Sequence, residues 1–332
     1  MAALIHLIAG ARPNFMKIAP IVRTLLTRKD ELTFKIIHTG QHYDRQMSDV
    51  FFEELGIPKP DYHLEAGGGS HAEQTAKIML AYETIATDER PALTLVVGDV
   101  NSTLACAIVA KKQHIPVVHV EAGLRSGDRQ MPEEINRLVT DAITDVFFAT
   151  EPAGVDNLLR EGQAPEAVHF VGHVMVDNLL YQLGKLEHTD RSDFESERLK
   201  AGLDRYGLVT MHRPSNVDDP ATLERIVKAL GRIAEQLPLI FPIHPRTRKN
   251  LEQAGLGVPP NIRLSGPLSY MEFLNLMKDA TMVLTDSGGL QEETTALEIP
   301  CLTLRDNTER PVTIDEGTNT LVGTDARAIE EA

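Results

Sequence analysis

The stretch LTLVVGDVNSTLACAIVAKKQHIPVVHVE, residues 93–121, decides the fold of this chain. It begins with an apolar run, passes through a Gly-Asp turn into a helical stretch, and returns to a second β-branched run. We predict strands at Leu93–Gly98 and Pro116–Glu121, joined by a helix at Ser102–Gln113. Such a βαβ unit has parallel strands and a right-handed crossover.

The same alternation continues in both directions. Further strands are predicted at Leu4–Ala9, Phe34–Thr39, Val146–Thr150 and Val168–Gly172, and helices at Phe15–Thr27, Gln46–Leu55, Glu73–Ala86 and Glu134–Thr144. A helix is predicted at Val174–Leu186. It is followed by a charged stretch, Glu187–Asp204, which we expect to be a linker or a lid-like surface helix. A second series of alternating strands and helices then begins. Its strands are predicted at Leu208–Met211, Pro238–His244, Ile262–Ser265, Met282–Asp286 and Pro300–Arg305. We therefore expect an α/β protein with two doubly wound Rossmann-like domains, residues 1–173 and 174–332, and a ligand in a central cleft.

The composition is that of a globular protein, with 42% hydrophobic and 24% charged residues. The net charge of −15 argues against nucleic acid or an anionic membrane as a partner. Two cysteines, Cys106 and Cys301, fit a reducing compartment better than a disulfide framework. The sequence has no 18-residue apolar run, and its first residues already form a predicted strand, so we expect a cytoplasmic protein.

Familiar fingerprints of nucleotide sites and serine nucleophiles are missing. The sequence contains no GxGxxG after its first strand, no GxxxxGK[ST] and no GxSxG. A Walker ATPase, a typical NAD enzyme and a serine hydrolase are therefore disfavoured. His119 and Glu121 share one face of a predicted strand, but no third ligand has suitable spacing, so we expect no metal site.

A strand-to-helix turn in the second half has the features of a phosphate site. It lies in MVLTDSGGLQEE, residues 282–293, where Ser287 is placed to cap a helix. Gly288 and Gly289 would let the backbone approach a bound phosphate at the positive end of the helix dipole. Glu293 follows about one and a half turns later, within reach of a ribose. The alternative is an ordinary capped turn without a ligand.

Basic, imidazole and carboxylate side chains follow other predicted strands. The basic and imidazole residues are Arg12, Lys17, His212, Arg213, His244, Arg305 and Arg310, and the carboxylates are Asp99, Glu121 and Glu133. Arginine suits phosphate oxygens, and histidine can protonate a departing phosphate. Carboxylates gathered at the carboxyl edge of a parallel sheet favour acid/base chemistry. Surface salt bridges, structural histidines and a solvated acidic face are the alternatives.

Nine separated motifs carry a resemblance to a known family. They are GARPNFMKIAP, TGQHYD, VVGDVNS, HVEAGLRSGD, PEEINR, VGHVMVDN, VTMHRPSN, DSGGLQEE and RDNTERP followed by GT. Together they resemble the non-hydrolysing UDP-N-acetylglucosamine 2-epimerases over essentially the whole chain. The resemblance implies a glycosyltransferase-B-like fold and a homodimer in cell-surface polysaccharide biosynthesis. It also implies interconversion of UDP-GlcNAc and UDP-ManNAc without a cofactor, in which UDP leaves to give a 2-acetamidoglucal and then adds back.

Residue roles follow from the resemblance, motif by motif. Asp99, Glu121 and Glu133 would be the acid/base set, and the assignment of each proton transfer stays open. The remaining implied roles are phosphate departure for His212, orientation of the carboxylates or substrate for Arg137, ribose binding for Glu293, and stacking near the uracil for Phe273. Residues implied to hold the substrate, chiefly its diphosphate, are Arg12, Lys17, Arg213, His244, Ser287, Gly288, Gly289 and Arg310. Asp128 and Glu134 are taken as solvated or structural charges.

The chain departs from the family pattern in three places. Asn14 stands where many members have glutamate, and we expect it to alter the loop around Arg12. TGQHYDRQM and GGGSHAEQT differ from the form associated with activation by UDP-GlcNAc, so strong dependence on that effector is not expected. The sequence ends at Ala332, before the helix with which family members cross back onto the first domain, so we expect that helix to be truncated here.

Four other functions remain open at this stage. The chain could be an epimerase for a related UDP-diacetamido-uronic acid, or a hydrolysing relative that releases ManNAc and UDP. It could be a UDP-sugar glycosyltransferase, or a nucleotide-sugar-binding protein without activity. GARPNFMK argues against the hydrolysing relative, and three carboxylates argue against a glycosyltransferase.

Overall fold

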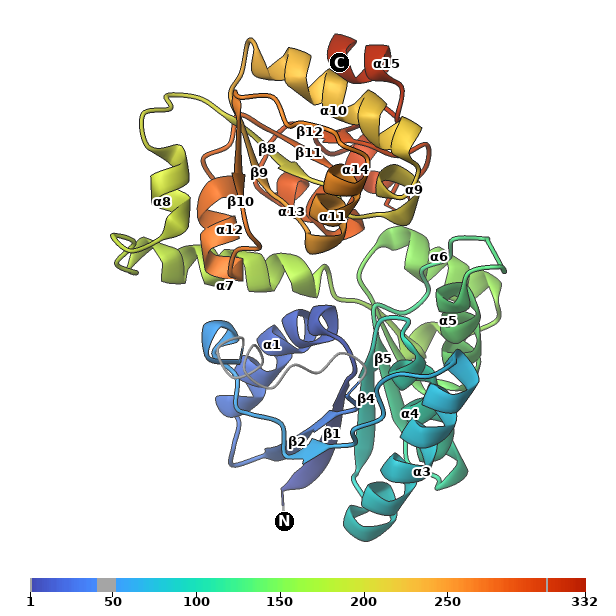
Figure 1. The fold of residues 1–332 in the computed structure, drawn as a ribbon. Coiled ribbons are helices and arrows are strands. Elements are labelled where there is room, and N and C mark those ends of the chain that lie inside the picture. Colours follow the sequence, from blue (N-terminus) through green and yellow to red (C-terminus); the bar gives the residue numbers. More distant parts are fainter. Residues whose placement is uncertain (1, 41–51, 309) are drawn as a thin grey trace. The chain divides into compact units, whose positions relative to one another are not determined.

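The computed structural model of the protein describes residues 2–40, 52–308 and 310–332 (Figure 1). The backbone of Arg12 is among them, but its side chain is not. The chain divides into two compact units, Met1–Asn178 and Leu179–Ala332. The division falls inside helix α7 (Val174–Glu187), a few residues beyond the boundary proposed from the sequence.

The first unit is built on a parallel sheet with the strand order β3-β2-β1-β4-β5-β6-β7. Its strands are β1 (Ala3–Ala9), β2 (Leu32–His38), β3 (Tyr62–His63), β4 (Leu93–Val97), β5 (Val117–Val120), β6 (Val146–Ala149) and β7 (Val168–Phe170). Its helices are α1 (Arg12–Leu26), α3 (His71–Glu89), α4 (Asn101–Lys112), α5 (Pro132–Ile143), α6 (Pro152–Arg160) and the short 3-10 helix η1 (Pro165–Ala167). The predicted β4–α4–β5 unit is therefore present, with β4 and β5 paired in parallel.

Side chains alternate between two cores because successive residues of a strand point to opposite faces. Leu7 belongs to the core beneath α1, whereas its neighbour Ile8 belongs to the core beneath α3 and α4. Figure 1 shows α3, α4 and α5 together on one side of the sheet. Strands that are buried on both faces explain why the sequence reads as nearly continuous apolar runs.

The second unit repeats the design with a six-stranded parallel sheet of order β10-β9-β8-β11-β12-β13. Its strands are β8 (Gly207–Thr210), β9 (Leu239–Pro242), β10 (Ile262–Ser265), β11 (Met282–Thr285), β12 (Cys301–Thr303) and β13 (Asn319–Leu321). Its helices are α8 (Glu195–Lys200), α9 (Pro214–Val217), α10 (Pro220–Ala234), α11 (Pro245–Gln253), α12 (Tyr270–Met277), α13 (Gly288–Ala296), α14 (Val312–Asp315) and α15 (Ala326–Glu331).

Each sheet reverses its strand order once, and ligands of doubly wound folds bind at that reversal. In the first unit the reversal lies between β1 and β4, which pair in parallel. In the second unit it lies between β8 and β11. The loops and helices that follow these four strands carry Arg12, Lys17, Asp99, His212, Arg213, Ser287, Gly288, Gly289 and Glu293.

Local details of the sequence prediction compare with the structure as follows. Of the two alternatives for Glu187–Asp204, a linker or a surface helix, the structure has a helix: α8 packs on α12, and Asn275 donates to Ser196 Oγ at 2.9 Å. Strands β3 and β13 were not predicted, since two or three residues give no alternation to detect. Of the predicted Gln46–Leu55 helix, residues 52–55 are helical, and the remainder lies outside the described residues.

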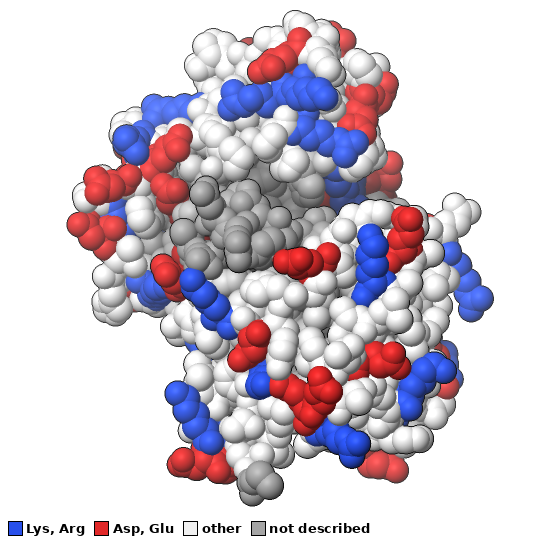
Figure 2. Space-filling model, turned by 60° about the horizontal axis from the view of Figure 1, so that its bottom comes forward, with Lys and Arg blue, Asp and Glu red and all other residues white. Residues whose placement is uncertain are grey.

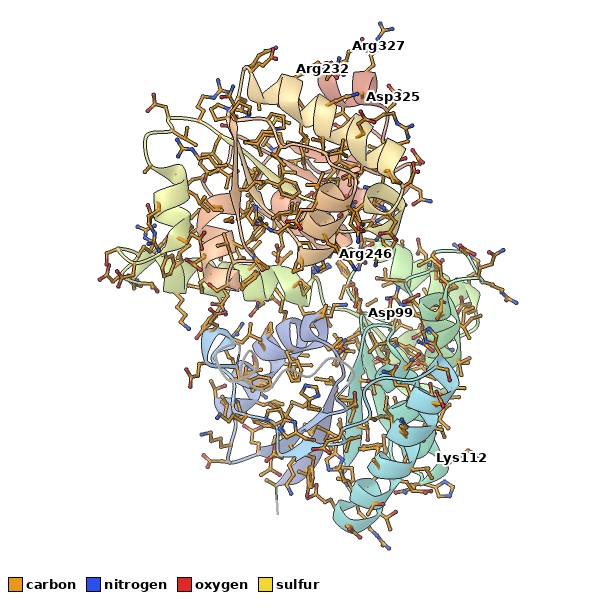
Figure 3. The ribbon with its side chains drawn as sticks, in the orientation of Figure 1. Asp99, Lys112, Arg232, Arg246, Asp325 and Arg327 are labelled. Atoms are coloured by element: carbon orange, nitrogen blue, oxygen red, sulfur yellow. The ribbon has the colours of Figure 1, made fainter. Side chains whose placement is uncertain are left out.

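The surface of the protein carries both basic and acidic side chains. Figure 2 shows Lys and Arg interspersed with Asp and Glu on the face that it presents. Helix α15 packs on α10, where Arg232 Nε lies 2.7 Å from Glu330 Oε1, and Figure 3 labels Arg232 beside Arg327. Among the helices of the described ranges, none is long and apolar enough to cross a membrane. Cys106 and Cys301 are both buried and free.

We predict that Gly123→Ala destabilises the first unit by about 3 kcal/mol, measured by denaturant unfolding. Gly123 has a φ of 81°, and an added Cβ would lie 2.2 Å from the carbonyl oxygen of Gly154. Gly127→Ala is the matched control, because Gly127 has a φ of 73° and nothing within 4 Å of an added Cβ. Gly127→Ala should therefore lower stability only by the cost of a left-handed alanine, about 1 kcal/mol. Equal losses in the two variants would contradict the steric argument.

Candidate active site

The turn that follows β1 is held by Asn14. Its Oδ1 accepts from the backbone N–H groups of Gly10 (3.2 Å) and Ala11 (2.9 Å), and its Nδ2 donates to Val97 O at 3.1 Å. Asn14 therefore joins the β1–α1 turn to the end of β4. This departure from the family pattern makes a structural anchor next to Arg12, whose side chain lies outside the description.

Glu121 leaves β5 in a left-handed conformation. Its φ is 69°, and β5 ends one residue earlier, at Val120. The prediction that Glu121 continues the strand and shares a face with His119 is therefore wrong. The turn directs the nearly buried Glu121 carboxylate to an ion pair with Lys17 of α1. An added Cβ on Gly98 would lie 3.3 Å from both Glu121 Oε2 and Lys17 Nζ, so this glycine, with a φ of 70°, leaves room for the pair.

Asp99 follows β4 and is fixed from α5 (Figure 3). Arg137 Nη2 lies 2.6 Å from Asp99 Oδ2, and Asn136 Nδ2 donates to Asp99 O at 2.8 Å. Arg137 is buried, and its Nε has no hydrogen-bond partner among the described residues. Glu133 is exposed in the first turn of α5, four residues before Arg137 and thus on the same helix face. Asp99 and Glu121 therefore leave adjacent strand ends, whereas Glu133 is related to them only through α5.

The other two carboxylates of this segment have local roles. Glu134 is buried and accepts from Ser126 N (2.8 Å), Ser126 Oγ (3.0 Å) and Gly127 N (3.3 Å). It closes the loop between β5 and α5. Asp128 is exposed and accepts from Gln130 N at 2.9 Å. The interpretation of both as structural or solvated charges agrees with these contacts.

In the second unit, Asp286 organises the strand reversal. It follows β11, is fully buried, and accepts from the backbone N–H groups of His212 (3.0 Å) and Arg213 (2.8 Å). His212 Nδ1 lies 3.0 Å from Asp286 Oδ1. Burial alone would raise the pKa of Asp286, but the hydrogen bonds from His212 and Arg213 outweigh it and hold the pKa below its usual value. An ionised Asp286 thus fixes the turn after β8 against the turn after β11.

The two candidate histidines lie close together. The ring centroids of His212 and His244 are 6.0 Å apart. His244 occupies the N-cap position of α11, where its Nδ1 accepts from Arg246 N at 3.2 Å. Burial, and then the neighbouring charges of His212 and Arg246, lower the pKa of His244. His212 pairs with Asp286 whereas His244 caps α11, so the two imidazoles at this edge have different environments.

Ser287, Gly288 and Gly289 form the predicted turn at the start of α13. Ser287 is the N-cap residue, but its side chain makes no capping hydrogen bond, contrary to the expectation from the sequence. Its backbone N–H instead donates to Thr285 Oγ1 at 2.9 Å. An added Cβ on Gly289 would meet nothing within 4 Å. The packing of the chain therefore does not require a glycine at this position.

Glu293 and Phe273 lie on neighbouring helices of the second unit. Glu293, on α13, is buried and accepts from Tyr270 Oη at 3.1 Å. Burial, and then the Glu293 charge, raise the pKa of Tyr270, so this phenol stays a donor. Phe273 is half-buried, one turn after Tyr270 on α12. A carboxylate held by a phenol, with an aromatic ring nearby, suits a ribose and a base.

The loop after β12 is tied to α13 at two points. Arg310 Nε lies 2.9 Å from Glu292 Oε1, and Thr308 Oγ1 donates to Gln291 Oε1 at 2.6 Å. Gln291 Nε2 in turn donates to Ser287 O at 3.3 Å, so one side chain links the loop to the glycine turn. Arg305 is buried, and its Nη2 donates to Asn307 Oδ1 at 3.2 Å.

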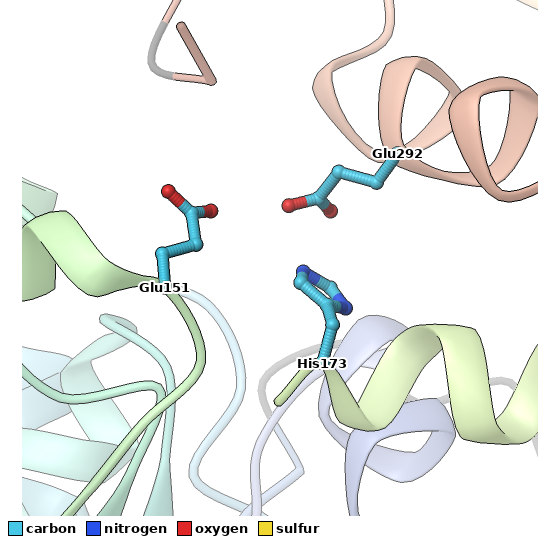
Figure 4. A group of neighbouring side chains, drawn as sticks. All are labelled: Glu151, His173 and Glu292. Atoms are coloured by element: carbon cyan, nitrogen blue, oxygen red, sulfur yellow. The ribbon is translucent and has the colours of Figure 1, made fainter. Parts of the chain in front are cut away.

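Side chains that could bind a metal ion lie in both units. Figure 4 labels Glu151, before α6, and His173, before α7, both in the first unit, and Glu292 on α13 of the second. Within either unit taken alone, the described residues hold no group of three such side chains that could bind one ion.

Three residues of this site were missed from the sequence. Asp286 stood in the quoted DSGG motif but was read only as the end of a strand. Asn14 was noted only as a departure from the family, and Gln291 was not considered. Their shared signal is a polar side chain in the segment that follows a strand, where buried backbone groups need partners.

The comparisons with known proteins agree with this geometry. The family model described as UDP-N-acetylglucosamine 2-epimerase matches residues 24–332. The chain belongs to the UDP-N-acetylglucosamine 2-epimerase family. The UDP-N-acetylglucosamine 2-epimerase of Methanocaldococcus jannaschii is 45% identical to it, over 96% of this chain and 88% of that relative. The UDP-2,3-diacetamido-2,3-dideoxy-D-glucuronate 2-epimerase of Pseudomonas aeruginosa is 42% identical, over 95% of this chain and 87% of that relative.

A solved structure supports both the fold and the family. The crystal structure of the Methanocaldococcus jannaschii UDP-GlcNAc 2-epimerase, in complex with UDP-GlcNAc and UDP, matches with a TM-score of 0.86. The identity is 43%, and the match covers 99% of this chain and 91% of that one. The predicted epimerase family and the fold of two glycosyltransferase-B-like Rossmann domains are therefore confirmed.

Proposed function

We propose that this epimerase interconverts UDP-GlcNAc and UDP-ManNAc by elimination and re-addition of UDP. The proposal rests on one observation: candidate carboxylates lie at strand ends of the first unit, whereas the candidate phosphate-binding turn lies at a strand end of the second. In the first unit the carboxylate of Asp99 follows β4 at the reversal, and that of Glu121 follows the adjacent strand β5. In the second unit the Ser287–Gly289 turn and His212 follow β11 and β8, the two strands of the reversal. Proton transfer at carbon needs the first set, and departure of a diphosphate needs the second.

In the elimination, the C2–H electron pair becomes the C1=C2 bond of a 2-acetamidoglucal, and the C1–O pair leaves with UDP. Glu121, held as a carboxylate by Lys17, is placed to take the C2 proton from one face. Asp99, held by Arg137, and Glu133 are the candidates for returning a proton to the other face. Re-addition of the UDP oxygen at C1 then completes the inversion at C2.

The second unit would stabilise the departing diphosphate. The first N–H groups of α13 and its dipole attract anions, and Gly288 and Gly289 allow close approach. His212 and Arg213 are held beside this turn through Asp286. We propose that Arg12, Lys17, His244 and Arg310 complete the substrate contacts, with Glu293 on the ribose and Phe273 near the uracil.

Gly289→Ala is expected to weaken UDP binding at least about tenfold without destabilising the protein. Alanine is the better helix former, and its Cβ would meet nothing of the chain within 4 Å, so the thermal midpoint should rise or stay constant. Calorimetric titration with UDP measures the affinity. Gly184→Ala, at a helical glycine of α7 with the same open surroundings, should leave UDP affinity unchanged. Unchanged affinity in Gly289→Ala would remove this turn from the nucleotide site.

The decisive test is incubation with UDP-GlcNAc in deuterated water, followed by proton NMR. UDP-ManNAc carrying deuterium at C2 is the expected product, because C2 is deprotonated and reprotonated from solvent. Free ManNAc with UDP would indicate a hydrolysing enzyme instead. Binding without any turnover would reduce the chain to a nucleotide-sugar-binding protein.

A second substrate has a specific observation in its favour. The Pseudomonas aeruginosa UDP-diacetamido-glucuronate epimerase is nearly as similar to this chain as the Methanocaldococcus jannaschii enzyme. Such a uronate carries an acetamido group at C3 and a carboxylate at C6. Parallel assays with both UDP-sugars decide between them, and we expect the larger kcat/KM with UDP-GlcNAc.

We further propose a cytoplasmic homodimer that supplies UDP-ManNAc for cell-surface polysaccharides. The first unit exposes Leu80 (69%) on α3 and Ile135 (42%) and Val139 (38%) on α5, the helices that flank α4. Apolar side chains gathered on one helical layer are typical of a self-association surface. Light scattering of the wild type and of Leu80→Lys tests it, and a monomeric wild type would contradict it.

A further inference from the structure

His119 is completely buried between the two turns that carry Asp99 and Glu121. Its Nε2 lies 2.8 Å from the carbonyl oxygen of Gly98, the residue before Asp99. Its Nδ1 lies 2.6 Å from Asp141 Oδ1 on α5. One imidazole thus joins β5, the end of β4 and a helix.

Both partners of this ring are acceptors. A peptide carbonyl has no proton to give, and Asp141 has no proton either if it is ionised. Arg125 Nη1 lies 2.7 Å from Asp141 Oδ2, which also accepts from Gly123 N at 3.0 Å. These two donors are independent of His119, and a carboxylate that binds a guanidinium and a backbone N–H is favoured in its ionised form.

The ring geometry then leaves one protonation state without a repulsive contact. A neutral imidazole would turn a lone pair toward either the Gly98 oxygen or the Asp141 carboxylate at hydrogen-bond distance. With both nitrogens protonated, each donates. Arg125 also binds Glu161, at 2.9 and 2.7 Å, so two cations and two anions balance within the group.

We propose that His119 is an imidazolium in the resting enzyme and acts as the positioning residue for the carboxylates of Asp99 and Glu121. The inference rests on the proposed function, since it concerns how that acid/base pair is held. It assigns to His119 a role distinct from metal binding and from substrate contact.

The positioning follows from where the two hydrogen bonds are made. Gly98 and Glu121 are both left-handed, with φ values of 70° and 69°, and such turns persist only where their surroundings hold them. The bond to Gly98 O fixes the peptide plane that leads into Asp99. Asp141, held by His119, fixes Gly123 N and so the turn that begins at Glu121.

Charged groups reach this region from every neighbouring element. The cations besides His119 are Lys17 on α1, Arg125 in the β5–α5 loop and Arg137 on α5, and the anions are Asp99, Glu121, Asp141 and Glu161. Lys17 pairs with Glu121, Arg137 with Asp99 and Arg125 with Glu161, so the positive charge of His119 is the one that offsets Asp141, which Arg125 also contacts. Loss of that charge should alter how the rate depends on pH, not only its maximum.

The protonation state is tested on the wild-type protein, labelled with ¹⁵N in its histidines. Two protonated-nitrogen signals are expected from His119 across pH 6 to about 8, assigned by their absence in His119→Gln. A neutral tautomer in that range would overturn the proposal. This measurement needs no turnover, so its outcome is independent of whether the proposed epimerisation is correct.

The positioning role is tested with two neutral variants. Asparagine keeps an amide donor near the Nδ1 position and loses the bond to Gly98, whereas glutamine keeps a donor near Nε2. We expect kcat to fall about 100-fold in His119→Asn and less in His119→Gln, with UDP affinity within about twofold in both. The pH profile of kcat should also shift. The kcat values are expressed per UDP-binding site, so that unfolded protein does not count. If both variants then have the kcat of the wild type, the positioning role is overturned. An inactive wild type would instead refute the proposed function.

Discussion

Glu121→Gln is expected to abolish the exchange of the C2 hydrogen while leaving UDP affinity within a few-fold. Glutamine has nearly the size of glutamate but cannot accept a proton from carbon. A positioned general base contributes about 10²- to 10⁴-fold, so kcat should fall by about that factor. In the proposed mechanism Glu121 takes the C2 proton and does not contact UDP, so its replacement should leave UDP affinity nearly unchanged.

Two measurements separate this role from a structural one. Deuterium incorporation at C2, followed by proton NMR, reports the proton transfer directly. Calorimetric titration with UDP reports the nucleotide site. The ion pair with Lys17 lies in a nearly buried place, so the thermal midpoint of the variant should also be recorded. A large loss of UDP affinity would assign Glu121 to the nucleotide site.

Asp128→Asn is the matched control for this variant. Asp128 belongs to the same carboxylate-rich segment, but it is exposed and accepts only locally, from Gln130 N at 2.9 Å. Its replacement should leave kcat, UDP affinity and stability close to those of the wild type. Loss of activity in Asp128→Asn would show that the segment acts through its overall charge.

The fold was predictable where strands are long and buried on both faces. Residues 93–121 give two apolar runs around a helix, and the structure has β4, α4 and β5 there. The edge strands β3 and β13 were not predictable, because they contain two and three residues and depend on neighbours far away in the sequence. For the Glu187–Asp204 stretch the sequence left open a linker or a lid-like surface helix, and the structure has helix α8 there, where Lys200 pairs with Asp279 at 2.9 Å.

The sequence indicated which strand ends carry the candidate residues, but not which side chains contact one another. Motif and position identified Asp99 and Arg137, whereas the 2.6 Å contact between them depends on the packing of α5. The direction of Glu121 was misjudged because alternation along a strand says nothing about a left-handed residue at its end. Asn14 and Asp286 satisfy buried backbone groups, and these become visible only once the turns are folded.

The two units use the same device to set their chemistry. In each, a polar side chain that follows one central strand bonds to the backbone at or just beyond the end of the neighbouring central strand. Asn14 does so between β1 and β4, and Asp286 does so between β11 and β8. Two residues without any proposed contact to substrate, Asn14 and Asp286, thus fix the turns that carry the proposed site residues.

Asp286→Asn should therefore lower stability by about 3 kcal/mol and kcat about 100-fold. The buried carboxylate accepts from His212 N, Arg213 N and Asn216 Nδ2, and His212 Nδ1 lies beside it. An amide cannot accept all of these, and its own NH₂ group would face other donors. Urea unfolding and steady-state kinetics measure the two effects.

The pH dependence of this effect has a definite sign. The folded-state pKa of Asp286 lies below its usual value, so the ionised carboxylate stabilises the fold above the unfolded pKa of about 4. That contribution is lost as the pH falls from there through the folded pKa. The stability gap between wild type and Asp286→Asn should thus be constant near neutrality and narrow below about pH 4. Asp218→Asn is the control, because Asp218 is 40% exposed and paired with Arg246, and it should cost less than about 1 kcal/mol. A gap that stayed constant down to acid unfolding would show that Asp286 acts through its shape and not through its charge.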